Sequence, residues 1–310
     1  APHCVHLNPD QSKVTKSVHV YALDDIPGDT DVVVLHNTRD MNIFSAGVDA
    51  RLVYVIDDGL LDMPSWHPAR DGFDARVVRS LLGRCDGVVA STAYLAEQAS
   101  GFNSNVHLVR NRLYWPMWEQ AGLERVGGRV RVGWMGGFSW RREDLKVLRG
   151  LLPQFLRRNP HVDFVAAGDP PVATHDFLGI PEDRRVSVDG FPFGKNYLRL
   201  RELLPFDVGV VPLASSLFNE AKSHLKGMEY NACGIPYVAS DTESYRHYTR
   251  DGVNGFVVRK PRQWLSRLET LVNDHELRDS MGRSAREEAE RHKIEDHWEE
   301  WERAYQSVLT

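Results

Sequence analysis

Three charged residues of one segment have the types and spacing for phosphate and ribose chemistry. Lys222, Lys226 and Glu229 lie at positions i, i+4 and i+7, so they share one face if a single helix includes all three. Two cations near a helix N-terminus, where backbone N–H groups have no partner inside the helix, suit a phosphate group. A carboxylate two turns from the first lysine can accept hydrogen bonds from a ribose diol. The alternative is a solvated helix face with an ordinary i,i+4 pattern.

A second candidate is the segment RVGWMGGFSWRRED at Arg131–Asp144. Gly136 and Gly137 follow a predicted strand and let a ligand approach the backbone closely. Arg141 and Arg142 come next, before a predicted helix, and glycines with nearby arginines suit a diphosphate. Taken alone, the glycine pair is also explained by turn geometry.

Other candidate chemistries have less support. Asp57 and Asp58 follow a predicted strand and can be read as an acidic metal-binding pair, or as side chains that cap and solvate a strand end. The 13 histidines form no tight cluster of metal ligands. Three widely spaced cysteines give neither a disulfide framework nor a zinc pattern, and Cys233 is predicted to be a buried, inert thiol. The sequence has no nucleophile elbow and no P-loop, so hydrolase and phosphate-cleaving functions lack support.

The elements that position these residues alternate between short apolar runs and amphipathic stretches. The predicted strands of the first part are Val18–Leu23, Asp31–His36, Leu52–Ile56, Gly87–Ala90 and Val106–Val109. Helices are predicted at Phe73–Leu82 and Ala93–Ala99. Because the apolar runs lack strict alternation, they indicate a parallel sheet that is covered on both faces.

A second series follows a proposed linker that ends at Gly127-Gly128. Its predicted strands are Val130–Met135, Phe164–Ala167, Val186–Val188, Val208–Pro212, Tyr237–Ala239 and Phe256–Val258. Its predicted helices are Asp144–Arg158, Tyr197–Leu204, Lys222–Ala232 and Pro261–Asp274. The tail Asp279–Leu309 reads as one long charged helix whose aromatic residues pack against protein. We therefore expect two doubly wound α/β domains that face a cleft, with binding groups after the strands.

Charge differs between the parts of the 310-residue chain. Residues 1–124 carry 10 Lys and Arg against 16 Asp and Glu, residues 125–283 carry 24 against 19, and residues 284–310 carry 4 against 8. The whole-chain charge of −5 thus combines a basic middle with acidic flanks. A small phosphate-bearing ligand in a basic pocket fits this pattern better than a large polyanion or an anionic membrane. No apolar run reaches the length of a membrane span.

Several segments resemble family-4 retaining glycosyltransferases of the GT-B fold. Two segments resemble the nucleotide-sugar-binding half of that family: FNEAKSHLKGMEYNACGIPYVASD at Phe218–Asp241 and DGVNGFVV at Asp251–Val258. Three segments resemble the first domain of the family: VYVIDDGLLDMP at Val53–Pro64, CDGVVASTAYLAEQ at Cys85–Gln98 and NVHLVRNRLYWPMW at Asn105–Trp118. The resemblance covers most of residues 50–260. It implies a first, acceptor-side domain of residues 1–124 plus 284–310, a nucleotide-sugar-binding domain of residues 125–283, and a final helix that crosses back to the first domain.

The resemblance also assigns residues to the donor. Glu229 matches the glutamate that holds the donor ribose, and Lys222–Lys226 matches the segment that faces the donor sugar and phosphates. The VDGFP loop matches the loop beside the nucleobase. The implied donor-binding residues are Gly136, Gly137, Phe191, Ser223, His224, Leu225 and Glu229. The basic residues implied to neutralise the leaving diphosphate, in place of a metal ion, are Arg141, Arg142, Lys222 and Lys226.

The first domain is implied to serve the sugar and the acceptor. His36 and Asp57 are candidate catalytic residues there, and Asn37 and Asp58 are candidate acceptor-side residues. The sequence departs from the family in three ways: the first of the two usual glutamates is replaced by Ala221, the basic pair is adjacent, and no glycine-rich loop precedes Val18.

The resemblance implies a metal-independent hexosyl- or pentosyltransferase that needs no cofactor. The enzyme would move a sugar, with retention, from a UDP- or GDP-linked donor to a hydroxyl of a glycan or small molecule. We expect a cytoplasmic protein without stable membrane insertion. One alternative is the same chemistry on hydroxymethylated bases of phage DNA, with Arg110–Arg112, Tyr114 and Trp115 contacting a base or phosphate, or else only packing in the linker. Two others are a nucleotide-sugar epimerase and a non-catalytic nucleotide-sugar binder.

Overall fold

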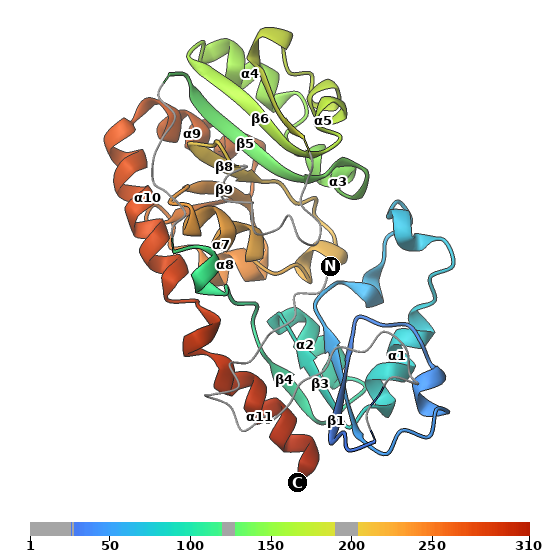
Figure 1. Ribbon diagram of the computed structural model, residues 1–310. Helices are drawn as coiled ribbons and strands as arrows, with labels where there is room; N and C mark the ends of the chain where they lie inside the picture. Colours follow the sequence, from blue (N-terminus) through green and yellow to red (C-terminus); the bar gives the residue numbers. More distant parts are fainter. Residues whose placement is uncertain (1–25, 27, 120–127, 190–203) are drawn as a thin grey trace. The chain divides into compact units, whose positions relative to one another are not determined.

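The computed structural model describes residue 26 and residues 28–119, 128–189 and 204–310. In this part the chain forms two compact units, each built on its own sheet (Figure 1). The first unit contains the described residues up to Arg112, the segment Ser216–Ser223 and residues Ile294–Thr310. The second unit contains the described residues of Leu113–Ser215 and His224–Lys293.

The first unit is a parallel four-stranded sheet in the order β1-β2-β3-β4. Its strands are β1 (Val32–His36), β2 (Arg51–Ile56), β3 (Gly87–Ala90) and β4 (Val106–Leu108). Its helices are α1 (Ala75–Arg84), α2 (Ala93–Ser100), the short α6 (Leu217–Glu220) and α11 (Trp298–Leu309), with 3₁₀ turns η2 (Asn42–Phe44), η3 (Leu60–Asp62), η4 (Pro68–Arg70) and η8 (Ile294–Asp296). Asp74 and Thr92 cap α1 and α2 by accepting hydrogen bonds from the first turn.

Alternate side chains of these strands enter two apolar clusters. Tyr54, Ile56 and Val88 pack with α1 and α2, whereas Val53, Val55 and Val89 pack with α11. Period-two alternation along β2 and β3 explains this division, because successive residues point to opposite faces. Burial on both faces explains why these strands read as continuous apolar runs.

The second unit is a parallel six-stranded sheet in the order β10-β9-β8-β5-β6-β7. Its strands are β5 (Val130–Gly137), β6 (Val162–Asp169), β7 (Arg185–Asp189), β8 (Val208–Val211), β9 (Tyr237–Ser240) and β10 (Gly255–Val258). Its helices are α3 (Phe138–Leu145), α4 (Leu151–Arg158), α5 (Pro171–Leu178), α7 (Leu225–Ala232), α8 (Glu243–Tyr248), α9 (Pro261–Asn273) and α10 (His275–Glu290). Apolar residues of α4 and α9 pack on one face of this sheet, and those of α7 and α8 pack on the other (Figure 1). The predicted α/β fold with two parallel sheets is confirmed.

Three predicted helices have different bounds in the structure. The helix predicted over Asp144–Arg158 is two helices, α3 and α4, because Gly150 adopts a left-handed conformation with φ of 82° between them. The long helix predicted at the end of the chain is interrupted between α10 and α11. The helix predicted from Lys222 begins at Leu225. The predicted strand Val18–Leu23 and most of the predicted helix Tyr197–Leu204 lie outside the described residues.

The division into units differs from the predicted one at three places. The described residues from Leu113 to Glu119 and residues 284–293 belong to the second unit, whereas only Ile294–Thr310, with η8 and α11, return to the first. Ser216–Ser223, which we call the inserted segment, belongs to the first unit although the chain on both sides of it belongs to the second. Local sequence patterns cannot predict the unit to which this segment belongs, because that depends on which unit buries its side chains.

Candidate functional site

The strand order of the second unit places a reversal beside β5. From β5 the chain continues to β6 and β7 on one side, and β8, β9 and β10 lie on the other side. In open α/β sheets, ligands bind outside the carboxyl ends of the strands at such a reversal. The ends of β5 and β8 are therefore the candidate site of this unit.

The end of β5 is bound by side chains of α7. The strand pairs with β8 only at Val132 and Gly133, so its last residues have no strand partner on that side. The backbone N–H of Met135 donates instead to the hydroxyl of Tyr230 at 3.1 Å, and Lys226 Nζ donates to the carbonyl oxygen of Met135 at 2.6 Å. The ammonium of Lys226 also lies 5.5 Å from the centre of the Trp134 ring. These contacts place one predicted cation directly at the predicted glycine turn.

The glycine turn itself is held by close backbone approach. Gly136 of β5 is in register with Gly168 of β6. A Cβ atom on Gly168 would overlap the carbonyl oxygen of Gly136, and a Cβ on Gly136 would lie 2.7 Å from the Trp134 ring. The two strands need glycine at these positions, and Gly136 itself is buried near the end of β5.

The adjacent arginines have different surroundings. The guanidinium of Arg141 lies 3.4 Å from the carboxylate of Asp144, which is 1% exposed and accepts a 2.9 Å hydrogen bond from the backbone N–H of Ala214 in the loop after β8. The guanidinium of Arg142 lies over the Phe177 ring of α5, 5.3 Å from its centre. Arg141 is thus connected to both strand ends at the reversal, whereas Arg142 contacts α5.

Helix α7 carries the predicted ribose residue. Glu229 is 5% exposed and lies three residues after Lys226 in this helix. His224 precedes the first residue of the helix, Leu225, and its ring stacks on Tyr248 with centroids 4.6 Å apart and an interplanar angle of 10°. The prediction that one helix face carries Lys222, Lys226 and Glu229 was wrong, because the helix begins after Lys222.

Lys222 and Ser223 belong to the inserted segment and contact the first unit. The ammonium of Lys222 forms an ion pair with the carboxylate of Asp58, and the Ser223 hydroxyl accepts a 2.9 Å hydrogen bond from the Asn111 amide. The structure therefore pairs Lys222 with an acceptor-side candidate of the first unit.

The other first-unit candidates form one group after β1 and β2. His36 Nε2 lies 3.2 Å from the carboxylate of Asp57. The Asn37 amide donates to the same carboxylate, and the Asp57 N–H donates back to the Asn37 side chain at 3.2 Å. Asn37 adopts a positive φ of 47°, which is unusual for a residue other than glycine. The four candidates His36, Asn37, Asp57 and Asp58 thus lie at the ends of two adjacent strands.

Sequence reasoning missed the residues that support the site. Tyr230 and Asp144 have no ligand-like spacing, and they take their roles from the short pairing of β8 with β5. The sole sequence signal is the i,i+3 spacing of Arg141 and Asp144. Phe191, the predicted nucleobase neighbour, lies outside the described residues.

Several other predicted features can be compared with the structure. Arg112 has a side chain 9% exposed and paired with Glu300 at 2.9 Å, and Trp115 is also buried, so these two residues of the proposed basic patch pack inside the protein. Cys85 and Cys233 are both buried, and burial raises the pKa of the Cys85 thiol to about 12. Within the described ranges, no three His, Cys, Asp or Glu side chains are placed to hold a metal ion. Nor does any described helix have the length and apolarity needed to span a bilayer.

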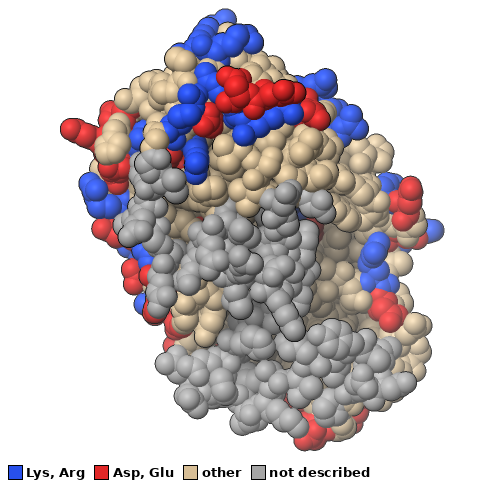
Figure 2. Space-filling model, turned by 45° about the horizontal axis from the view of Figure 1, so that its top comes forward, with Lys and Arg blue, Asp and Glu red and all other residues tan. Residues whose placement is uncertain are grey.

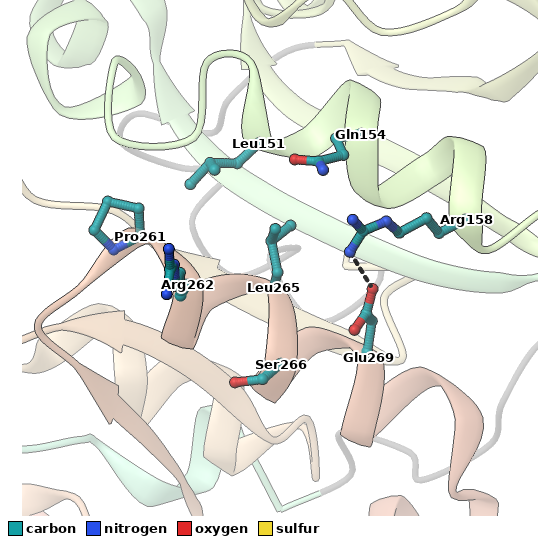
Figure 3. Close-up of a pocket in the computed structure, with 8 residues that line it drawn as sticks. All are labelled: Leu151, Gln154, Arg158, Pro261, Arg262, Leu265, Ser266 and Glu269. Carbon is teal, nitrogen blue, oxygen red and sulfur yellow. Dashed lines mark ion pairs between the residues drawn. The ribbon is translucent and has the colours of Figure 1, made fainter.

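A surface pocket lies between α4 and α9, away from the predicted site residues. Its walls include Gln154, Arg158, Leu265 and Glu269, and Arg158 lies 3.6 Å from Glu269 across it (Figure 3). None of the predicted donor or acceptor residues lines this pocket. On the face drawn in Figure 2, basic side chains lie beside acidic ones and form no broad field of a single sign.

Comparison with known proteins finds a family model that matches most of the second unit. Residues 129–274 match the family model of group 1 glycosyl transferases, and they include β5, α7 and the reversal between β5 and β8. A D-inositol 3-phosphate glycosyltransferase of Paenarthrobacter aurescens (strain TC1) is 36% identical over 86 residues, which are 27% of this chain and 20% of that protein.

Solved structures with similar folds cover most of this chain. TarM of S. aureus, in a complex with fondaparinux, α-GlcNAc-glycerol and UDP, has a TM-score of 0.62 at 16% identity and is matched over 85% of this chain and 52% of its own. HepE of Anabaena, in complex with UDP and glucose, has a TM-score of 0.62 at 17% identity, over 86% of this chain and 77% of its own. Sucrose-phosphate synthase of Thermosynechococcus elongatus has a TM-score of 0.64 at 14% identity, over 86% and 70%. The chain has the GT-B fold and spans about half the length of TarM.

Proposed function

We propose, from the group 1 glycosyl transferase match at residues 129–274 and the GT-B fold around it, that this protein is a glycosyltransferase. It moves a hexosyl or pentosyl group from a nucleoside diphosphate sugar to a hydroxyl acceptor. The observation that carries the proposal is the contact of Lys226 with the end of β5, inside the matched region, with Glu229 in the same helix and Arg141 in the helix that follows β5. UDP is the favoured nucleotide because the TarM and HepE structures contain it, and GDP remains the alternative.

The proposed chemistry depends on stabilising the departing diphosphate. Lys226 and Arg141 supply positive charge, and Gly137, the half-buried residue before α3, supplies a backbone N–H group, as the negative charge develops on the leaving group. Glu229 accepts hydrogen bonds from the ribose diol. With two cations at the leaving group, the mechanism needs no metal ion. Retention of configuration is proposed from the resemblance to retaining glycosyltransferases, with attack of the acceptor hydroxyl on the same face from which the diphosphate leaves.

The proposed acceptor site is the group of polar residues after β1 and β2. His36 and Asn37 orient Asp57, and Asp58 lies beside them in sequence. Carboxylates and imidazoles are suitable partners for the hydroxyls of a glycan or of a small polyol. The three cysteines are few and widely spaced, and this spacing supports a cytoplasmic location.

A transfer assay tests this function. The protein is incubated with UDP- and GDP-linked hexoses and pentoses and with a panel of glycans, glycerol and myo-inositol, and the products are analysed by mass spectrometry and NMR. We expect a new glycosidic linkage with the anomeric configuration of the donor. An epimerised donor would instead indicate a nucleotide-sugar epimerase. Binding of the donor without any product would indicate a non-catalytic nucleotide-sugar binder.

A further inference from the structure

We propose that Lys222 is a positioning residue for the acceptor and not a ligand of the donor diphosphate. Its ammonium fixes one oxygen of the Asp58 carboxylate, which leaves the other oxygen directed to an acceptor hydroxyl. This inference rests on the proposed glycosyltransferase function. It reverses the assignment that the sequence predicts for Lys222.

The first observation is that the inserted segment is packed into the first unit. Phe218 and Ala221 are 1% and 0% exposed, and Ala221 belongs to the apolar cluster formed by β2, β3, α1 and α2. The carbonyl oxygen of Ala221 accepts a 3.5 Å hydrogen bond from the Thr92 hydroxyl. A Cβ atom on Gly59 would lie 2.9 Å from the carbonyl oxygen of Phe218, so the backbones approach closely there. Lys222 is therefore held next to Asp58 by packing as well as by charge.

The second observation is the environment of the lysine itself. Its side chain is 13% exposed, and its Nζ lies 4.3 Å from the centre of the Phe218 ring. This ring in turn contacts His67 and Trp66, at centroid distances of 5.0 and 6.1 Å. An ammonium that is largely removed from water needs a carboxylate or aromatic partner, and here it has both. The geometry accounts for the charge of Lys222 without a phosphate.

The third observation concerns the two oxygens of Asp58. Oδ1 accepts the ion-pair hydrogen bond from Lys222 and a 2.8 Å hydrogen bond from the Gly59 N–H. No hydrogen bond from a described residue reaches Oδ2. Because the side chain of Asp58 is 33% exposed, a hydroxyl can approach this second oxygen. A carboxylate that is fixed through one oxygen presents the other in a defined direction, and O–H···O⁻ hydrogen bonds are short and strong.

Without the lysine, the carboxylate of Asp58 loses this fixed direction. It also remains next in sequence to Asp57, a like charge, with no cation bound to it. The expected effect is on acceptor binding, because Lys222 contacts the first unit through Asp58 and Lys226 contacts β5 in the second. The two lysines of one sequence motif thus serve different substrates.

The test compares Lys222→Met with Lys226→Met, which is a matched lysine substitution four residues away. The affinities for UDP and GDP are measured by calorimetry, and KM is measured for the acceptor that the wild-type protein glycosylates in the panel. We expect Lys222→Met to raise the acceptor KM about tenfold, the size of one charged hydrogen bond, with nucleotide Kd changed less than about twofold. Lys226→Met is expected to weaken the binding of UDP or GDP instead.

Two further variants distinguish positioning from a general loss of structure. Lys222→Arg retains the cation and is expected to restore the acceptor KM to within about threefold of wild type. Asp58→Asn raises the acceptor KM as Lys222→Met does, and the double variant adds little, because both changes remove the same contact. Thermal unfolding of each variant checks folding.

Two results overturn the inference. The first is that Lys222→Met weakens the binding of UDP or GDP as much as Lys226→Met does. The second is that the acceptor KM of Lys222→Met is unchanged. Wild-type protein that makes no product from any donor and acceptor overturns the proposed function instead. The nucleotide affinities of the two lysine variants still test the inference about Lys222 in that event.

Discussion

Glu229 is a carboxylate almost fully buried in a helix whose N-terminal end contacts the glycine turn. Replacing Glu229 by Gln keeps its size and one acceptor oxygen but removes the charge that we propose contacts the ribose diol. We expect kcat/KM for the donor to fall about 100-fold, within the range of a lost charged hydrogen bond in a dry site. Steady-state kinetics at varied donor concentration measure this change. An unchanged kcat/KM with a correctly folded variant would remove Glu229 from the donor site.

Arg141 and Arg142 are a natural matched pair, since they are adjacent and of the same type but contact different elements. Arg141 contacts Asp144, which accepts a hydrogen bond from the loop after β8, whereas Arg142 lies on Phe177. We therefore expect Arg141→Met to lower kcat at least tenfold more than Arg142→Met. Transfer rates at saturating donor give the comparison. Equal effects of the two substitutions would mean that the contacts to Asp144 and Phe177 do not decide which arginine stabilises the leaving diphosphate.

At the scale of the elements, the sheet of the second unit depends on the glycines at the end of β5 and β6. Gly168→Ala forces β6 away from the carbonyl of Gly136, and we expect a loss of about 1–3 kcal/mol in the free energy of unfolding. Urea denaturation measures it. Gly28→Ala is the control, since nothing lies within 4 Å of a Cβ there and its stability is expected to match wild type. Equal stability of both variants would contradict the close approach of the two strands.

Strands were predictable from the sequence and helix starts were less so. Runs such as Gly87–Ala90 are buried on both faces, and burial appears directly as apolar sequence. Helix α7 begins at Leu225 because the three residues before it are committed to other contacts, Lys222 with Asp58, Ser223 with Asn111 and His224 with Tyr248. Helical periodicity cannot report such tertiary contacts. The types of the site residues were visible, but their division between two units was not.

At the scale of the whole molecule, each unit contains a histidine whose burial lowers its pKa below the usual 6.5: His175 in the second unit and His107 in the first. In the unfolded chain these histidines take up a proton as pH falls through 6.5, whereas the folded units take it up only at lower pH. Unfolded protein therefore binds more protons in this window, and the free energy of unfolding falls as pH decreases below 6.5.

Urea midpoints between pH 7.5 and 5 test this pH dependence. His175→Gln retains a donor for the carbonyl of Val186, which the imidazole contacts at 3.1 Å, and does not titrate. We expect the variant to lose less stability on acidification than the wild-type protein. A slope as steep as that of wild type would assign the pH dependence to other groups.

A nucleotide that binds only the folded second unit raises its stability. At a concentration about 100 times Kd the gain is about 2.7 kcal/mol, which thermal unfolding detects as a higher Tm. We expect UDP or GDP to produce this shift, with the nucleoside alone as a control that lacks the diphosphate and shifts Tm less. Equal shifts by nucleoside and diphosphate would argue against phosphate binding by Lys226 and Arg141.

The inserted segment sets the order in which the protein is completed on the ribosome. The first unit begins first, yet its core needs Phe218 and Ala221, and one face of its sheet needs Trp301, Ala304 and Val308 of α11. The second unit has all its described residues once Lys293 has been synthesised. The sheet of the first unit therefore stays incompletely covered until α11 has been synthesised, although its strands precede those of the second unit in the sequence. Of the two described units, the one whose strands come first is completed last, and it is the unit that a chaperone would need to protect.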